Sequence, residues 1–232
     1  QLARLLDSPV AISNLRLARM IFVGGGPLDI TIAQQAREAK LPVAPTYGTT
    51  ETAGMVTLLS PDLFLSGRGG VGSVLPGTEV AFEKDGSLRI HSDSLCLGYH
   101  DRDFEKGAWL ETADLGYWDD HGSLHIEGRR DRIVNTGGVK VDPGKVENAI
   151  LQTGLAKACL VAGVPDQEWG QRIVAFCCPA SVNPRLIKEA LDDSLEGPFV
   201  PKLVLPVDHL PLTELGKPNL DAITAMIKDC VT

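Results

Sequence analysis

Several residues early in the chain have side chains that could together bind a nucleotide. Residues 24–27 read Gly-Gly-Gly-Pro, and glycines allow the backbone to approach a flat ligand closely. Residues 47–51 read Tyr-Gly-Thr-Thr-Glu, where a ring can stack on a base, a hydroxyl can bind a phosphate and a carboxylate can hold Mg²⁺. Asp114, within residues 109–117, offers a carboxylate that can accept both hydroxyls of a ribose. Taken singly, the glycines fit an ordinary turn after a strand, and Asp114 fits a turn or a cap.

Two later segments could contribute movement and positive charge. Residues 128–143 begin with a charged run and continue into Gly137 and Gly138, which is typical of a linker whose backbone angles can change. A solvated surface link would have the same composition. Lys217 follows a glycine and precedes a proline, so a rigid loop could hold its ammonium against the charge that develops on a phosphate. By itself, Lys217 is an ordinary surface lysine.

The elements that must position these residues follow from the hydrophobic pattern. Residues 20–51 predict a buried strand, a helix and a second strand, which is a βαβ unit. Residues 66–127 alternate in short stretches between glycines and predict a small antiparallel β-subdomain, with hairpin turns at Asp85-Gly86 and His121-Gly122. The fold class is therefore α/β plus α+β, with a βαβ layer and a β-subdomain in residues 1–128 and an α+β domain in residues 129–232.

The composition restricts the partners of the chain. Its 232 residues are 44% hydrophobic and carry a formal net charge of −8, which is typical of a globular protein. Because phosphate neutralisation needs grouped Lys and Arg, the absence of a basic cluster argues against nucleic acid as a partner. No apolar run approaches the roughly 20 residues of a membrane helix, so we expect no membrane span.

Cysteine and histidine patterns give two further expectations. The five cysteines have no Cys-x-x-Cys spacing, so we expect buried, reduced thiols and a cytoplasmic protein. Cys177 and Cys178 are adjacent in an apolar run and should point to opposite faces of a strand. His121 and His125 have the spacing of metal ligands on a helix, but their segment predicts a hairpin, which disfavours a zinc site.

The order of these segments resembles that of the AMP-forming adenylate-forming family, which includes acyl-CoA synthetases, the adenylation domains of peptide synthetases and luciferases. The resemblance runs from about residue 20 to residue 217 and rests on residues 47–51, the Asp114 loop, residues 128–138 and residues 210–217. It implies that residues 1–128 are the C-terminal part of the family's large domain. It also implies that residues 129–232 are its hinged, mobile C-terminal domain.

The resemblance implies a role for each candidate residue. Glu51 would hold Mg²⁺, Asp131 would be the hinge, and Lys217 would bond both the substrate carboxylate and the α-phosphate. The loop that would line the tunnel for the pantetheine of CoA contains Gly137 and Gly138. The residues that would bind the nucleotide are Gly24, Gly25, Gly26, Pro27, Tyr47, Gly48, Thr50, Asp114 and Arg129.

The implied reaction uses ATP, Mg²⁺ and CoA to activate a small carboxylic acid. The acid first becomes an acyl-adenylate with loss of pyrophosphate, and the thiol of CoA then displaces AMP. Because the ammonium of Lys217 assists the first step and must leave before the second, a hinge at Asp131 would serve both steps.

The acid itself is suggested by two details. Glycine at position 26 and the sequence Thr-Glu-Thr-Ala at residues 50–53 resemble the o-succinylbenzoate–CoA ligases of menaquinone and phylloquinone synthesis. The alternatives are another aryl or medium-chain acid–CoA ligase, an enzyme that loads a carrier protein, and a non-catalytic partner that binds AMP or CoA. A homodimer is also left open.

The chain departs from the family pattern at three places. Thr-Ala-Asp at residues 112–114 replaces Thr-Gly-Asp, and Pro-Gly-Lys-Val-Glu at residues 143–147 replaces Pro-x-Glu-Val-Glu, which reverses one charge. The family's Ser/Thr/Gly-rich phosphate loop, which ends in Lys, has no counterpart here. The chain is then either a fragment of a longer enzyme or a truncated homologue. Since it begins at Gln1 rather than Met, we expect a fragment whose missing N-terminal part completes the enzyme.

Overall fold

The chain folds into two compact units, Gln1–Arg130 and Asp131–Thr232. The computed structural model describes residues 1–192, 194–213 and 218–231. The division between Arg130 and Asp131 lies close to the boundary expected after residue 128. Within the described ranges, no helix has the length and apolar character needed to cross a membrane.

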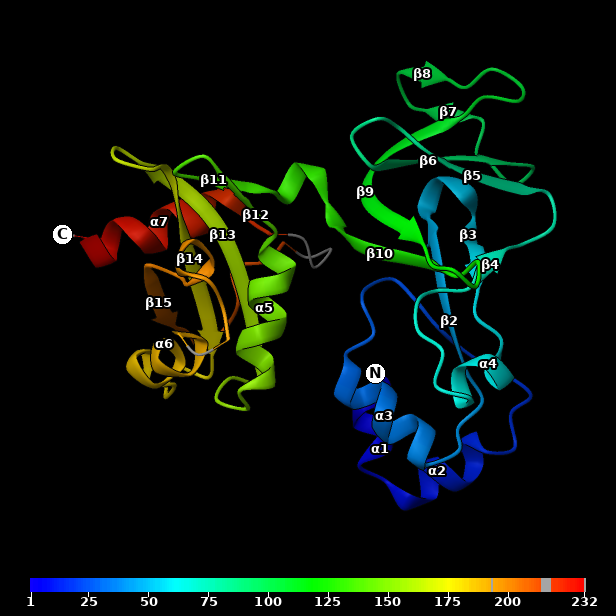
Figure 1. Cartoon of the computed structure of the whole chain (residues 1–232), viewed down its shortest axis with the longest axis horizontal. Coiled ribbons are helices and arrows are strands. Elements are labelled where there is room, and N and C mark those ends of the chain that lie inside the picture. Colours follow the sequence, from blue (N-terminus) through cyan, green and yellow to red (C-terminus); the bar gives the residue numbers. More distant parts are fainter. Residues whose placement is uncertain (193, 214–217, 232) are drawn as a thin grey trace. The chain divides into compact units, whose positions relative to one another are not determined.

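The N-terminal part of the first unit is the predicted βαβ arrangement, extended by further strands (Figure 1). Its sheet has the order β1-β2-β3-β4; β1 and β2 are parallel, and the other neighbours are antiparallel. Helix α3 starts at Ile30 because the carboxylate of Asp29 accepts the amides of Thr31 and Ile32, and it buries Ala33 and Ala36 against the sheet. The elements are α1 (Leu2–Leu6), α2 (Pro9–Leu15), β1 (Ile21–Val23), α3 (Ile30–Glu38), β2 (Val43–Thr49), η1 (Thr50–Thr52), β3 (Gly54–Leu58), α4 (Pro61–Leu65) and β4 (Ser73–Val74).

The remainder of the first unit is the predicted antiparallel β-subdomain. Its sheet has the order β10-β9-β6-β5, and Asp85-Gly86 and His121-Gly122 form the two expected hairpin turns. A small separate hairpin, β7 with β8, extends from the loop between β6 and β9. The strands are β5 (Thr78–Phe82), β6 (Ser87–Ser92), β7 (Gly98–Tyr99), β8 (Arg102–Asp103), β9 (Leu110–Trp118) and β10 (Leu124–Arg129).

The second unit is an α+β domain built on a sheet of order β12-β11-β14-β13, with β15 parallel to β14. The pair Asp142-Pro143 is typical of a capped helix start, and helix α5 indeed starts at Pro143, because the carboxylate of Asp142 accepts the amide of Gly144 at 2.9 Å. The elements are η2 (Arg130–Arg132), β11 (Val134–Thr136), β12 (Val139–Val141), α5 (Pro143–Gln152), β13 (Ala158–Asp166), β14 (Gly170–Cys178), α6 (Pro184–Asp192), η3 (Gly197–Phe199), β15 (Leu203–Pro206) and α7 (Leu220–Val231).

Strand β14 is buried on both faces, which explains its continuous apolar sequence. Ile173 and Cys177 belong to the core that α5 and α6 cover, whereas Val174 and Phe176 face the core that includes Ile223 of α7 (Figure 1). A strand covered on both sides loses the alternation of polar and apolar residues. The two layers of helices therefore enclose the sheet of the second unit.

The cysteines with described side chains are all free thiols. Cys177 packs in one core and Cys178 against the other, so the prediction that they point to opposite faces is confirmed. The expectation of burial is right for Cys177 only, because Cys96, Cys159 and Cys178 are half-buried. The degree of burial of these three depends on tertiary packing, which the composition of the chain does not reveal.

Candidate functional site

Asp114 of β9 is the centre of a polar cluster within the first unit. Asp114 is buried, with 12% of its side chain exposed, and each of its carboxylate oxygens accepts a hydrogen bond. The Tyr47 hydroxyl, from β2, donates to Oδ2 at 2.6 Å, and Nη1 of Arg129, from β10, donates to Oδ1 at 3.0 Å. The structure thus brings together three residues that the sequence predicted to bind one nucleotide.

Backbone pairing accounts for part of this cluster. Asp114 and Arg129 are direct partners in the register of β9 and β10, so their side chains lie side by side on one face. Tyr47 reaches the cluster from the other sheet of the unit, and this contact is purely tertiary. Arg129 keeps about half of its side chain exposed, so the ion pair lies at the surface of the site.

Burial and the negative charge of Asp114 together raise the pKa of Tyr47 far above its usual value. Burial disfavours the phenolate by removing water, and the adjacent carboxylate disfavours it by repulsion. Tyr47 therefore remains a neutral hydrogen-bond donor throughout the physiological range. The carboxylate that it contacts is held in place by one neutral and one cationic donor.

Gly48 lets β3 approach β2 closely at an irregularity directly after Tyr47. The pairing of β2 with β3 shifts register between Tyr47 and Gly48, and a Cβ at position 48 would lie 1.5 Å from the carbonyl oxygen of Gly54. The chain then forms η1, where Thr49 and Thr52 cap each other, and this turn contains Thr50 and Glu51. The Tyr-Gly-Thr-Thr-Glu segment is therefore a strand end followed by a tight turn.

The predicted glycine segment begins where β1 ends. Because β1 and β2 are parallel neighbours, their carboxyl ends lie at the same edge of the sheet, where α/β folds bind ligands. A Cβ at Gly24 would lie 2.4 Å from Oγ1 of Thr46, so this glycine is required by the neighbouring strand. Gly25 has a φ of 84°, which favours glycine, whereas no atom lies within 4 Å of a Cβ placed at Gly26. Pro27 ends this segment, which the sequence placed beside the base.

Glu51 is a single carboxylate in the turn that follows β2. The hydroxyl of Tyr99 donates to its Oε1 at 2.9 Å, a contact that the sequence did not predict. No group of three or more potential metal ligands occurs among the residues that the structure describes. Mg²⁺ in nucleotide sites commonly has one or two protein carboxylates, and phosphates and water complete its shell. Glu51 therefore fits a metal ion that arrives with a nucleotide rather than a resident one.

Asp131 lies between two arginines that are fixed within their own units. Arg130 pairs with Asp85 in the first unit, and Nη2 of Arg132 lies 2.5 Å from Oε1 of Glu147 in the second. Arg129, Arg130 and Asp131 are exposed, so the charged run lies at the surface. The division between the two units falls between Arg130 and Asp131.

Gly137 and Gly138 form the turn between β11 and β12, and both have a positive φ. A Cβ at Gly137 would lie 2.5 Å from Cε3 of Trp169, whose carbonyl oxygen accepts the Gly137 amide at 2.9 Å. Nζ of Lys202 lies 5.7 Å from the Trp169 ring. Sequence reasoning missed Trp169, because an isolated tryptophan in a hairpin has no distinctive pattern. Lys217 lies outside the described residues.

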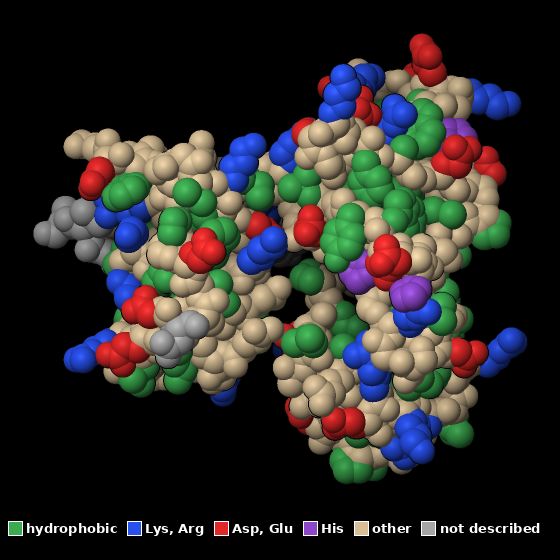
Figure 2. Space-filling view, viewed as in Figure 1, with side chains coloured by type: hydrophobic (Ala, Val, Ile, Leu, Met, Phe, Trp, Pro, Cys, Tyr) green, Lys and Arg blue, Asp and Glu red, His purple; other side chains and the backbone are tan. Residues whose placement is uncertain are grey.

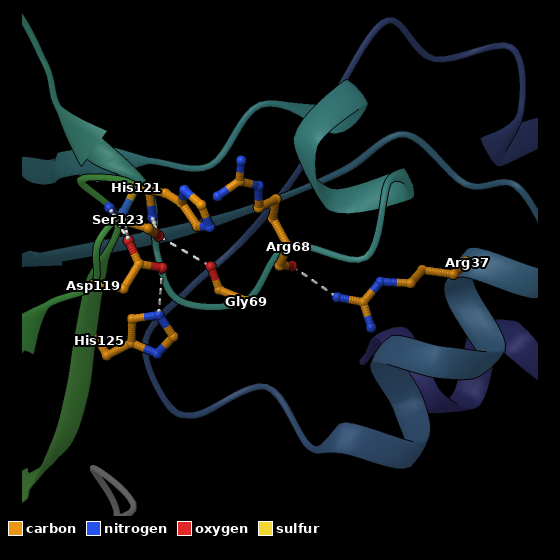
Figure 3. A network of polar contacts seen from close by, with 8 residues as sticks. Arg37, Arg68, Gly69, Asp119, His121, Ser123 and His125 are labelled. Atoms are coloured by element: carbon orange, nitrogen blue, oxygen red, sulfur yellow. Dashed lines mark hydrogen bonds and ion pairs between the residues drawn. The ribbon is translucent and has the colours of Figure 1, made fainter.

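A second polar network holds the β9–β10 hairpin against the loop that follows α4 (Figure 3). Asp119 accepts the amides of His121 and Ser123 and pairs with Nε2 of His125 at 3.1 Å. The Ser123 hydroxyl donates to the carbonyl oxygen of Gly69 at 3.0 Å. The amide of Ser123 is the main reason that the pKa of Asp119 is lowered. His125 is therefore used structurally, and the pair of histidines lies on a hairpin, as the sequence predicted.

The surface charges are mixed on the face that Figure 2 displays. Lys and Arg side chains lie among Asp and Glu side chains there, without a continuous basic area (Figure 2).

A family model and several curated proteins are similar in sequence to this chain. The family model described as the AMP-binding enzyme C-terminal domain matches residues 145–217. A 2-succinylbenzoate–CoA ligase of Bacillus velezensis is 31% identical over 215 residues, which are 86% of this chain and 44% of that protein. The corresponding ligase of Bacillus subtilis is 31% identical over 168 residues, covering 66% of this chain and 34% of its own length. The chain thus spans less than half the length of these curated relatives.

Solved structures agree in fold. The o-succinylbenzoate CoA synthetase of Bacillus subtilis, in complex with the acyl-adenylate intermediate, has a TM-score of 0.79 at 28% identity. That match covers 94% of this chain and 48% of the other. An amide bond synthetase from Marinactinospora thermotolerans also has a TM-score of 0.79, with 27% identity and coverage of 97% and 51%.

Proposed function

Because the chain matches the C-terminal portion of the AMP-forming adenylate-forming enzymes in sequence and in fold, we propose that it serves an acid–CoA ligase that activates o-succinylbenzoate. The observation that carries the proposal is the cluster of Tyr47, Asp114 and Arg129, together with Glu51 in the turn after β2. The substrates are ATP, the acid and CoA. The N-terminal part of the same enzyme, with its phosphate loop, completes the site.

Asp114 is the residue that holds the ribose. An ionised carboxylate has about four lone-pair sites, so it can accept ribose hydroxyls while it keeps the hydrogen bond from Arg129. Arg129 also contacts the ribose, and its attachment to Asp114 fixes the carboxylate before the nucleotide arrives. Tyr47 lies against the adenine, with its hydroxyl turned to Asp114 and its ring available for stacking.

The turn after β2 serves the phosphates. Thr50 donates its hydroxyl to the α-phosphate, and Glu51 offers a carboxylate to the nucleotide-borne Mg²⁺, which neutralises charge on the leaving pyrophosphate. The backbone of residues 24–27 lies along the base, where a side chain at position 24 would collide with Thr46. Lys217 brings a positive charge to the pentavalent centre during adenylation.

The second half-reaction needs the second unit in another orientation. Asp131 is the residue about which it rotates, because the ion pairs of Arg130 and Arg132 keep each flanking residue with its own unit. Rotation removes Lys217 and brings the loop of Gly137 and Gly138 to the acyl-adenylate, where it lines the path of the CoA thiol. The cytoplasmic location and the dimer considered from the sequence stay predictions.

The experiment is pyrophosphate release by the protein expressed from its complete reading frame. ATP and Mg²⁺ are supplied with o-succinylbenzoate, benzoates or fatty acids, with and without CoA. We expect o-succinylbenzoate to give the strongest signal and sustained turnover only with CoA. A stronger signal from another aryl or medium-chain acid would refute the assignment of o-succinylbenzoate as the substrate. If no acid of the panel led to pyrophosphate release, the result would favour a non-catalytic nucleotide-binding protein.

A further inference from the structure

The hydrogen bond from Tyr99 to Glu51 joins two segments that the sheets do not connect. Tyr99 belongs to β7, which among the described strands pairs only with β8, and its hydroxyl lies 2.9 Å from Oε1 of Glu51 in η1. Tyr99 is 45% exposed, so burial of the ring does not explain its position. A second bond runs from the amide of Cys96 to the carbonyl oxygen of Glu51 at 2.7 Å. One short segment therefore holds both the backbone and the side chain of Glu51.

The ring of Tyr99 is itself fixed by its neighbours. Phe104 contacts it edge to face, with ring centroids 5.2 Å apart and planes at 75°. The guanidinium of Arg102 lies 6.0 Å from the Tyr99 ring and 5.6 Å from the Phe104 ring. The amide of Phe104 donates to the carbonyl oxygen of Leu97 at 2.7 Å, which closes the hairpin loop. The hydroxyl is thus presented to Glu51 from a prearranged group of side chains.

We propose that Tyr99 is a positioning residue that orients the Glu51 carboxylate toward the divalent cation of the bound nucleotide. The inference rests on the proposed function, in which Glu51 meets that cation. Hydrogen bonds from neighbouring groups fix the orientation of ligating carboxylates and preserve their basicity, and their loss typically weakens metal binding 10- to 100-fold. A neutral phenol suits this role, because it orients the carboxylate without cancelling its charge.

The ordinary chemistry of a phenol agrees with this role. Tyrosine ordinarily titrates at about pH 10, so its hydroxyl keeps its proton near neutral pH and can donate to Glu51 when the nucleotide binds. Since an exposed tyrosine–carboxylate bond contributes little to folding, the cost of losing it should fall on metal-dependent binding.

The test compares ATP binding with and without Mg²⁺ in the protein expressed from its complete reading frame. The quantity is the ratio of the Kd for ATP in EDTA to the Kd in saturating Mg²⁺, measured by isothermal titration calorimetry. Tyr99→Phe keeps the ring and removes the hydroxyl, so we expect this ratio to fall about tenfold while the Kd in EDTA is unchanged. Tyr117→Phe is the matched control, because that hydroxyl makes no hydrogen bond within the described residues, and its ratio should equal that of the wild type.

The outcomes separate the two proposals. An unchanged ratio in Tyr99→Phe, with a Mg²⁺-dependent wild type, refutes the positioning role alone. Equal weakening with and without Mg²⁺ means that Tyr99 only supports the fold of the site, which also refutes it. A wild type whose ATP affinity is independent of Mg²⁺ refutes the metal role of Glu51 itself. In a Glu51→Gln background, Tyr99→Phe should have no further effect on the ratio.

Phe104→Leu provides a second variant that leaves the hydroxyl in place. Removal of the edge-to-face contact lets the Tyr99 ring move, so the ratio should fall by less than in Tyr99→Phe but remain below that of the wild type. A ratio in Phe104→Leu that matches the wild type would show that the prearranged ring is unnecessary and would contradict the argument for positioning.

Discussion

The hydrogen bond between Tyr47 and Asp114 should contribute to the free energy of unfolding, and this contribution can be measured without any ligand. Tyr47→Phe removes the hydroxyl but keeps the ring, and Asp114 keeps its bond to Arg129. A hydrogen bond to a charged group contributes about 1.5–3 kcal/mol to stability, so the variant should lose an amount in that range at about pH 8. Because Tyr47 is half-buried and the Asp114 side chain is only 12% exposed, solvent replaces this hydrogen bond poorly.

The stability that Tyr47→Phe loses should be smaller at alkaline pH. The pKa of Tyr47 is raised in the folded protein above its unfolded value near 10, so the unfolded chain releases a proton that the folded chain retains. The stabilisation is complete below the unfolded pKa and declines as the pH rises toward the folded pKa. Because the folded wild type retains this one proton, its free energy of unfolding should fall by about 1.4 kcal/mol by about pH 11. Tyr47→Phe has no such proton, so the difference in the free energy of unfolding between wild type and variant should decrease by about 1.4 kcal/mol.

Urea unfolding followed by tryptophan fluorescence measures this difference at several pH values. Trp109 and Trp118 lie in the same unit as Tyr47 and report its unfolding. All other alkaline titrations are shared by the two proteins and cancel in the comparison. Tyr117→Phe removes an exposed phenol and is the control for the substitution itself. A difference that stays constant from about pH 8 to about pH 11 would refute the assignment of a raised pKa to Tyr47.

Four further outcomes are expected. Lys217→Ala should abolish acyl-adenylate formation but spare thioester formation from supplied acyl-adenylate, and an equal loss of both half-reactions would contradict its role. Asp131→Pro should permit adenylation and block the thioester step, whereas normal overall turnover would exclude rotation at this residue. Gly48→Ala should destabilise the protein by about 2 kcal/mol, because its Cβ would lie 1.5 Å from the Gly54 carbonyl oxygen. Gly26→Ala is the matched control, because no atom lies within 4 Å of its Cβ, and its free energy of unfolding should differ from that of the wild type by less than about 0.5 kcal/mol. Glu51→Gln should lower the pKa of Tyr99, and an ultraviolet titration that matches the wild type would show that their bond is absent.

Local features of the fold were predictable because they depend on short-range interactions. Asp142 followed by proline predicted the start of α5, and the aspartate side chain indeed accepts the amide of Gly144. The hairpin turns at residues 85–86 and 121–122 were predicted from Asp-Gly and His-Gly pairs, whose glycines adopt a positive φ. The hairpin at 121–122 also explains why the two histidines nearby do not lie on one face of a helix.

The candidate site was predictable only as a set of residues. Residue types, their order and their family resemblance determined that Tyr47, Asp114 and Glu51 should act on one nucleotide. Which atoms meet was decided by the tertiary structure: Tyr47 and Asp114 are 67 residues apart in the chain, and Tyr99 and Glu51 are 48 apart. Spacing along a strand or helix fixes only which side chains share a face, whereas contacts between sheets depend on how their cores pack. The sequence by itself thus determined the local elements and the residue types available for chemistry. Tertiary packing decided which hydroxyl donates a hydrogen bond to each carboxylate.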